Sequence, residues 1–152
     1  MSDQNNDQQE QSHERNIQDD DQQEQSHERL NYWVENLDPE QYAVIVEGAT
    51  EPPFTGKYLH VKGPGIFHCA ACGQALFSTK DKYDSGSGWP SFSRPISGNS
   101  IGERKDTSYA MMRIEVHCSR CGGHLGHVFD DGPPPTGKRY CINSLSLVYI
   151  ET

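Results

Sequence analysis

The apolar positions that follow residue 29 recur with helical spacing. Leu30, Trp33, Val34 and Leu37 occupy positions i, i+3, i+4 and i+7. In a helix with about 3.6 residues per turn these four side chains share one face, so the pattern predicts a first short helix.

A second short helix is predicted directly after the first. Asp38 is a favourable N-cap residue, and Pro39 suits the first helical position because its missing N–H is not needed there. Gly48 then favours the left-handed conformation that commonly ends a helix. The apolar side of this helix consists of Tyr42, Ile45 and Val46.

Beyond Gly56 the helical spacing gives way to short segments bounded by Gly, Pro or polar residues, which indicates strands. The candidate strands are Lys57–Lys62, Gly65–His68, Ala75–Ser78, Tyr109–His117 and Leu145–Ile150. No pattern for a long helix follows residue 48. The sequence therefore predicts a mainly antiparallel β body preceded by two small helices.

Two of these segments indicate which side chains face a core. In Tyr109–His117, Met112, Ile114 and Val116 alternate with mostly polar neighbours, so one face is expected to pack. In the last strand, apolar residues occupy both faces towards the end, which favours a central position in a sheet.

Composition separates residues 1–29 from the rest of the chain. They are almost entirely polar, and Asp7–Arg15 (DQQEQSHER) is repeated without change as Asp21–Arg29. They hold 9 acidic and 2 basic residues, a net charge of −7 out of −9 for the whole chain. So few apolar groups cannot offset the entropy cost of ordering. We therefore predict a disordered tail over residues 1–29 and a folded domain over residues 30–152.

The charge of the folded part argues against some functions. With 13 acidic and 11 basic residues, it is nearly neutral and shows no basic stripe for nucleic acid or anionic lipid. No apolar run is long enough to span a membrane, and the N-terminus lacks the pattern of a secretory signal. A cytoplasmic protein is expected, in which cysteines serve metal binding or catalysis rather than disulfides.

Four of the five cysteines form two matched pairs, Cys69-Ala-Ala-Cys72 and Cys118-Ser-Arg-Cys121, each followed by Gly. Glycine allows a tight turn that directs both sulfurs to one place, and two such turns can close a tetrahedral four-thiolate site. The pattern predicts one structural zinc ion, with iron as the minor alternative. Each pair taken alone could instead be a redox dithiol.

The fifth cysteine, Cys141, has no partner cysteine nearby in the sequence. It could be an inert apolar residue of a strand. However, Arg139 lies two positions earlier and would share its face of the strand. A cation there favours the reactive thiolate, and Asn143 on the same face could orient a polar substrate. Cys141 is therefore a candidate nucleophile.

Two further stretches carry candidate chemistry. His124 and His127 could be structural residues or metal ligands or, beside a lone cysteine, groups that transfer protons. Trp89 lies in the stretch Gly86–Phe92, where it could anchor the core or form an aromatic wall for a methyl–sulfur group.

Together these motifs resemble the methionine-R-sulfoxide reductase B family over about residues 30–150. The matching pieces occur in order along the chain and are individually weak but jointly specific. They are EPPFTG (51–56), the two CxxC pairs, YDSGSGWPSF (83–92), RIE (113–115), HLGHVF (124–129), DGP (131–133), PTG (135–137) and RYCINS (139–144).

The resemblance implies a fold of two antiparallel sheets with a four-cysteine zinc site far from the active site. It implies that residues 30–152 are a peptide-methionine (R)-S-oxide reductase domain, which repairs the R epimer of methionine sulfoxide in oxidised proteins. Cys141 would attack the sulfoxide sulfur and become a sulfenic acid.

The resemblance also implies a role for each neighbour of the nucleophile. His124 and His127 would bind and protonate the sulfoxide oxygen. Trp89 and Phe129 would pack against the methyl group. Asn143 would orient the oxidised group, and Arg139 would support the thiolate.

One position departs from the family pattern. Many members carry a resolving cysteine in the glycine loop, where this chain has Ser87. The resemblance therefore implies a one-cysteine type, whose sulfenic acid needs thioredoxin, glutaredoxin or a small thiol as reductant. Two alternatives stay open: a non-enzymatic zinc module that binds protein, and a reductase that acts on free methionine sulfoxide.

Overall fold

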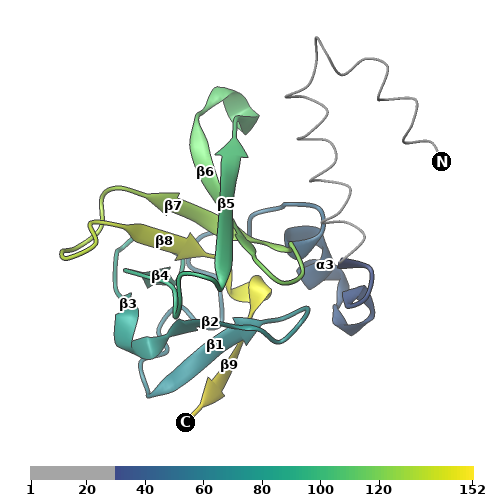
Figure 1. Cartoon of the computed structure of the whole chain (residues 1–152), viewed down its shortest axis with the longest axis horizontal. Coiled ribbons are helices and arrows are strands. Elements are labelled where there is room, and N and C mark those ends of the chain that lie inside the picture. Colours follow the sequence, from purple (N-terminus) through teal and green to yellow (C-terminus); the bar gives the residue numbers. More distant parts are fainter. Residues whose placement is uncertain (1–29) are drawn as a thin grey trace.

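The computed structural model describes residues 30–152 (Figure 1), and the predicted tail with its repeat lies outside the described residues. The helical elements are η1 (Val34–Asn36), α3 (Pro39–Ile45), η2 (Thr79–Asp81), η3 (Ser108–Ala110) and η4 (Ser144–Ser146). The strands are β1 (Gly65–Cys69), β2 (Ala75–Ser78), β3 (Lys82–Tyr83), β4 (Ser91–Phe92), β5 (Ile101–Asp106), β6 (Arg113–Cys118), β7 (His124–Phe129), β8 (Arg139–Ile142) and β9 (Leu147–Glu151).

The strands form two antiparallel sheets, as the resemblance implied. One has three strands in the order β2-β1-β9, and the other has six in the order β3-β4-β8-β7-β6-β5. The hairpin of β5 and β6 extends away from the rest of the body, whereas α3 lies at the side of the sheets (Figure 1). Within the described residues no helix is long and apolar enough to cross a membrane.

The core lies between the two sheets and is rich in aromatic rings. Phe77 of β2 stacks on Phe92 of β4 with ring centroids 4.4 Å apart, and Phe67 of β1 meets the same Phe92 edge-on at 5.2 Å. All three rings are fully buried. Buried aromatic pairs contribute about 0.5–1.5 kcal/mol each beyond the area they remove from water. The larger sheet adds Val116, Leu125, Val128, Tyr140 and Ile142 to this core.

The second predicted helix is confirmed, but the first is not. Asp38 caps α3 in a capping box, in which its side chain accepts from Gln41 N and the Gln41 side chain accepts from Asp38 N. Before it, residues 31–37 form a turn and the three-residue 3-10 helix η1. The predicted apolar face does contact the core, where Leu30 is buried and Trp33, Val34 and Leu37 are partly buried. A segment this short is nevertheless a marginal α-helix, because few backbone hydrogen bonds offset the cost of nucleation.

Three strand predictions need correction. Residues 57–60 form turns, and residues 61–62 are irregular, so this segment is not a strand. Strand β6 begins at Arg113 rather than Tyr109, because Tyr109 and Ala110 adopt left-handed conformations that interrupt any extended segment, and Met112 is exposed. Strand β9 is at the edge of its sheet, where Val148 and Ile150 face solvent. Apolar residues on both faces therefore did not signify a central strand.

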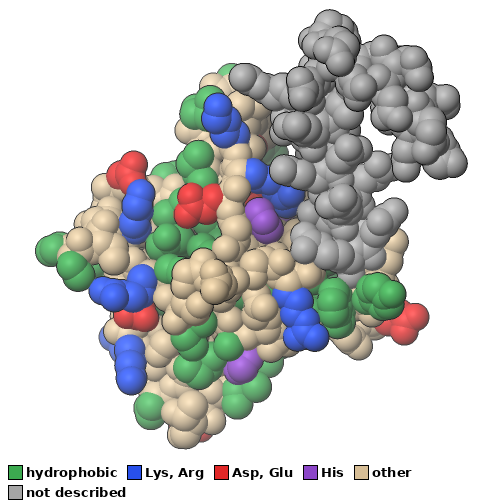
Figure 2. Space-filling model, viewed as in Figure 1, with side chains coloured by type: hydrophobic (Ala, Val, Ile, Leu, Met, Phe, Trp, Pro, Cys, Tyr) green, Lys and Arg blue, Asp and Glu red, His purple; other side chains and the backbone are tan. Residues whose placement is uncertain are grey.

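Charged groups are dispersed over the surface. On the face shown in Figure 2, Lys and Arg side chains lie among acidic and apolar ones rather than in one continuous stripe.

Candidate functional site

The polar face of the six-stranded sheet carries the candidate nucleophile. In the strand register, Cys141 of β8 pairs with His127 of β7, and His127 pairs with Glu115 of β6. On the other flank Ser91 of β4 pairs with Cys141. Paired residues point to the same side of a sheet, so these four side chains form one row across it.

A bulge in β7 brings His124 to the same face. His124 and His127 are three positions apart, so in a regular strand they would point to opposite faces. The β6–β7 register shifts here: Val116 pairs with Gly126, whereas His117 pairs with His124. The extra residue on β7 is a β-bulge, which re-aims the side chains beyond it. The two imidazole rings consequently lie 5.5 Å apart.

Cys141 opens into a cavity of about 220 Å³. The cavity is lined by Thr50, Ser87, Trp89, Arg113, Gly126, His127, Phe129, Arg139, Cys141 and Asn143. Beside the cavity, β7 and β8 lie so close together that a side chain at position 126 would collide with the Cys141 carbonyl group, so this position requires glycine. Two aromatic side chains, a half-buried thiol and an imidazole thus surround a space that suits a small, partly apolar group.

The thiol is not activated as strongly as its sequence neighbour Arg139 suggested. Burial raises the pKa of Cys141, while a hydrogen bond with Ser87 and the charge of Arg139 lower it only in part. Ser87 Oγ lies 3.9 Å from Cys141 Sγ. The net direction is a raised pKa, so the resting group is mainly a thiol near neutral pH.

Arg139 is held by other partners as well. Its Nε donates to Asp131 Oδ1 at 2.8 Å and its second amino group donates to Asp131 Oδ2 at 3.1 Å. The guanidinium group also lies over the Phe129 ring, 4.4 Å from the ring centroid. These contacts orient the cation and the aromatic wall together at the mouth of the cavity.

Each histidine is paired with a carboxylate. His127 Nε2 lies 2.6 Å from Asp106 Oδ2, and His124 Nδ1 lies 2.6 Å from Glu115 Oε2. Burial raises the pKa of Glu115, but hydrogen bonds from His124 and from Arg104 outweigh it and bring this pKa to about 2. The carboxylate is therefore ionised near neutral pH and orients the His124 ring.

The carboxylate of the second pair also has a lowered pKa. Burial raises the pKa of Asp106, and the hydrogen bond from His127 reverses this and holds it below its usual range. Burial lowers the pKa of His127, and Asp106 compensates only in part. His127 therefore favours the neutral form at rest.

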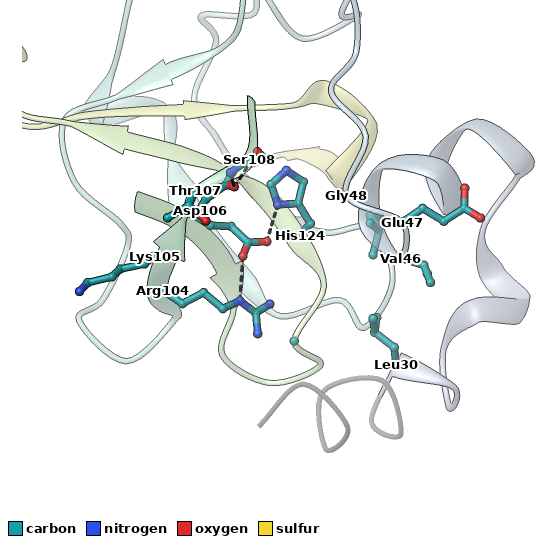
Figure 3. A pocket seen from close by; sticks show the side chains of 13 residues that line it. Leu30, Val46, Glu47, Gly48, Arg104, Lys105, Asp106, Thr107, Ser108 and His124 are labelled. Carbon is teal, nitrogen blue, oxygen red and sulfur yellow. Dashed lines mark hydrogen bonds and ion pairs between the residues drawn. The ribbon is translucent and has the colours of Figure 1, made fainter. Parts of the chain in front are cut away.

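His124 faces a second cavity, which has a volume of about 520 Å³ (Figure 3). The view shows His124 joined to the carboxylate that also binds Arg104, with Asp106 and Ser108 nearby and the 46–48 segment across the space. The His124 Nε2 atom is buried without a hydrogen-bond partner among the described residues. The structure thus divides the two predicted histidines: His127 lines the Cys141 cavity and His124 lines its neighbour.

Asn143 is engaged by the backbone on both sides. Its Oδ1 accepts from Glu51 N at 2.9 Å and its Nδ2 donates to Leu125 O at 3.0 Å. It is 3 % exposed and still lines the Cys141 cavity. An amide nitrogen carries two hydrogens, so one N–H remains after the bond to Leu125.

Glu51 ties the loops of the site together, and sequence reasoning missed it except as part of a motif. Its carboxylate accepts from Ser144 N at 2.9 Å and Leu145 N at 3.0 Å, and its carbonyl accepts from Trp89 Nε1 at 2.9 Å. Burial raises the pKa of Glu51, and the two backbone hydrogen bonds offset this in part. One residue therefore contacts all three parts: its backbone binds the tryptophan and the asparagine, and its side chain binds the segment after β8.

Asp106 was missed entirely, and it has no recognisable local signal. It pairs with Arg113 across the β5–β6 hairpin, and only the register shows that it reaches His127 on the next strand. An acidic residue at a strand end is common in surface hairpins, so nothing in the chain marks it out.

The two cysteine pairs form matching turns at the ends of β1 and β6. Cys69 O accepts from Gly73 N at 2.9 Å, and Cys118 O accepts from Gly122 N at 2.8 Å. Both glycines have positive φ angles, 83° and 82°, which side-chain-bearing residues rarely adopt. The predicted function of glycine after each pair is thereby confirmed.

The four sulfurs converge on one point. They all lie within 4.8 Å of one another, with Cys69 and Cys121 3.7 Å apart and Cys72 and Cys118 3.6 Å apart. Tetrahedral zinc–sulfur bonds of about 2.3 Å require sulfur separations of about 3.8 Å. The cluster can therefore hold a metal ion, and Gln74 Nε2 and Gly123 N donate to its sulfurs, as outer contacts of a metal site do.

Comparison with known proteins agrees with this geometry. The SelR domain family model matches residues 37–151. The relative from Saccharophagus degradans is 58% identical over 116 residues, which is 76% of this chain and 87% of the relative. The relative from Methanosarcina barkeri is 59% identical over 115 residues (76% and 81%), and that from Pseudomonas fluorescens 56% over 118 (78% and 90%). All three are named peptide methionine sulfoxide reductase MsrB. The chain belongs to this SelR, or MsrB, family.

Proposed function

We propose that this chain reduces the R epimer of methionine sulfoxide in proteins, with Cys141 as the nucleophile. One observation carries the proposal: the single cysteine outside the metal cluster lines a cavity with two aromatic walls and a carboxylate-paired histidine. Sulfur–aromatic contacts favour a methyl–sulfur group by about 0.3–1.5 kcal/mol, so Trp89 and Phe129 suit the methionine end.

The reaction transfers one oxygen atom. The Cys141 thiolate attacks the sulfoxide sulfur, whose oxygen becomes more basic as the attack proceeds. His127, with His124 beside it, holds this oxygen and passes to it the one proton that the Cys141 thiol releases as it becomes the thiolate. The oxygen ends on Cys141 as a sulfenic acid, and methionine leaves with its thioether restored.

Two neighbours support this step without taking part in bond changes. Arg139 stabilises the thiolate against the cost of burial. Asn143 aligns the loop after Cys141 through its backbone contacts, and its remaining amide N–H helps orient the oxidised group.

Recycling requires an external reductant. All five cysteines are accounted for by the metal cluster and the nucleophile, and Ser87 stands 3.9 Å from Cys141 where a resolving cysteine could act. A first thiol displaces the sulfenic oxygen as water to form a mixed disulfide, and a second thiol releases Cys141. Thioredoxin, glutaredoxin or a small thiol of the cytoplasm would serve.

The metal is proposed to be one structural zinc ion. Four thiolates in tetrahedral spacing leave no open position for substrate and need no redox change, which suits zinc. It would stabilise the proposed reductase domain, residues 30–152, without entering the reaction.

A stereospecific assay tests this function. Purified protein would be incubated with dithiothreitol and the separate R and S sulfoxide epimers of a blocked methionine, and with an oxidised protein. We expect turnover of the R epimer alone and none by Cys141→Ser, whose zinc content should match the parent. Turnover of the S epimer alone, or equal activity in Cys141→Ser, would overturn the proposal.

A further inference from the structure

Two methionines lie at the tip of the hairpin that joins β5 and β6. Met111 is 48% exposed and Met112 is 67% exposed, although methionine is ordinarily a core residue. The hairpin extends away from the body of the protein (Figure 1). Tyr109 and Ala110, both with φ of 57°, make the left-handed turn that precedes them. The thioether groups of Met111 and Met112 are therefore accessible both to oxidants and to other proteins.

We propose that Met111 and Met112 are an oxidation site of this protein, and that their R sulfoxides are reduced by Cys141 of a second copy. This inference rests on the proposed function. A protein-bound sulfoxide must protrude from its own surface to enter a cavity of about 220 Å³, and these side chains do so.

Repair within one chain is excluded by distance. Glu115 lies level with Cys141 across β7, so two strand spacings, about 10 Å, separate β6 from β8. Met112 and Met111 lie three and four residues further along, about 10 Å and 13 Å at the rise of a strand. The resulting diagonals of roughly 14 Å and 16 Å exceed the combined reach of a methionine and a cysteine side chain. The catalytic cysteine must come from another molecule.

The tip is connected to the Cys141 cavity through Arg113. Met112 directly precedes Arg113, which lines the Cys141 cavity and donates to Asp106 at 3.4 Å. Asp106 in turn binds His127. A sulfoxide adds a polar oxygen to a formerly apolar side chain next to this chain of contacts.

The chemistry balances with a peroxide and a thiol. Hydrogen peroxide transfers one oxygen to the thioether sulfur and leaves as water. Cys141 of the second copy takes that oxygen as a sulfenic acid and restores methionine. Two thiol groups of dithiothreitol then return Cys141 to the thiol, with release of water and formation of a cyclic disulfide.

A mixing experiment tests the proposal. Trypsin releases both methionines in one peptide, Asp106–Arg113 (DTSYAMMR), whose mass reports one or two added oxygens. Zinc-loaded Cys141→Ser, treated with hydrogen peroxide and then catalase, would be the substrate. The catalyst would be the double variant Met111→Leu, Met112→Leu, whose own peptide has a different mass.

We expect dithiothreitol plus catalyst to remove about half of the added oxygen, the R half, and dithiothreitol alone to remove none. The rate should rise with catalyst concentration. The catalyst would also be assayed on the R sulfoxide of a blocked methionine. Activity there without loss of oxygen from the peptide would overturn this inference and leave the proposed function standing. Inactivity on both would overturn the proposed function and this inference with it.

Discussion

At the scale of single residues, the environment of Cys141 keeps the proposed nucleophile mainly in its thiol form near neutral pH. Burial raises its pKa, and Ser87 and Arg139 counter this effect only in part. A thiol held in this way avoids random oxidation between turnovers, because the thiolate is the reactive form. The two residues that lower the pKa are also the ones whose replacement gives the clearest tests.

Replacing Ser87 by cysteine should convert the chain to internal recycling. The Ser87 Oγ atom is 3.9 Å from Cys141 Sγ, and a small side-chain rotation would bring two sulfurs to the disulfide length of about 2.05 Å. After one turnover on an R sulfoxide without reductant, peptide mapping of Ser87→Cys should find an 87–141 disulfide. The parent should instead hold a sulfenic acid that dimedone traps. Persistent dimedone labelling of Ser87→Cys would contradict this.

Replacing Arg139 by glutamine should move the pH profile to higher pH. The Arg139 charge lowers the pKa of Cys141, so its loss raises that pKa and reduces the thiolate fraction at any given pH. The pH dependence of kcat/KM, and of Cys141 alkylation by iodoacetamide in zinc-loaded protein, would measure the shift. Arg94→Gln, which removes a cation paired with Asp81 instead, is the matched control. An unmoved or lower profile in Arg139→Gln would refute the role given to this cation.

At the scale of elements, two irregular features assemble the site. The β7 bulge places His124 and His127 on one face of the sheet, which a regular strand could not do. The segment around Glu51 then fastens the Trp89 loop and the chain after β8 to each other. The regular strands hold the backbone in place, and the β7 bulge and the Glu51 segment orient the side chains of the site.

Replacing Glu51 by glutamine should destabilise the protein by about 1–3 kcal/mol, because the carboxylate accepts from two backbone N–H groups and an amide cannot serve both. Urea denaturation monitored by tryptophan fluorescence would measure the loss. Activity should also fall, because a weaker attachment of residue 51 to Ser144 and Leu145 also loosens the backbone carbonyl that accepts from the Trp89 indole. Glu47→Gln, at an exposed position, is the control and should change neither quantity. Equal stability of the two variants would contradict the role assigned to Glu51.

At the scale of the whole molecule, the cysteine cluster connects the two sheets. Cys69 ends β1 of the three-stranded sheet and Cys72 follows it, while Cys118 ends β6 of the six-stranded sheet and Cys121 follows it. A metal ion bound to all four would therefore cross-link the layers at the edge of the core. Structural zinc contributes apparent binding free energies of about 10–16 kcal/mol in small peptides, which is comparable to the total stability of a domain.

Metal removal should therefore unfold the domain rather than only inactivate it. We expect one zinc per chain by metal analysis, and loss of the cooperative thermal transition in Cys121→Ser or after strong chelation. Cys141→Ser should keep its zinc and its melting temperature, because Cys141 lies outside the cluster. A chelated protein that melts at the parental temperature would show that the cluster is dispensable for the fold.

Much of the fold could be read from local patterns. The cap at Asp38, strands β1 and β2, and the two glycine-followed cysteine pairs agree with expectation, because each depends on a few neighbouring residues. The failures have one origin. The predicted first helix and the central last strand were inferred from apolar spacing, and the strand Lys57–Lys62 from the residues that bound it, so all three rested on local sequence alone. Which side packs, and against what, is decided by distant parts of the chain.

The sequence by itself determined the mainly β body, the four-cysteine cluster that can hold a metal ion and the separate position of Cys141, because spacing and residue count suffice for these. Only the tertiary structure decided the surroundings of Cys141. It raised the pKa of the thiol by burial, placed Asp106 and Glu115 on the histidines, and engaged Asn143 with the backbone. These contacts cross strands through register and a bulge, and pairing between strands is a long-range outcome of folding that no local pattern encodes.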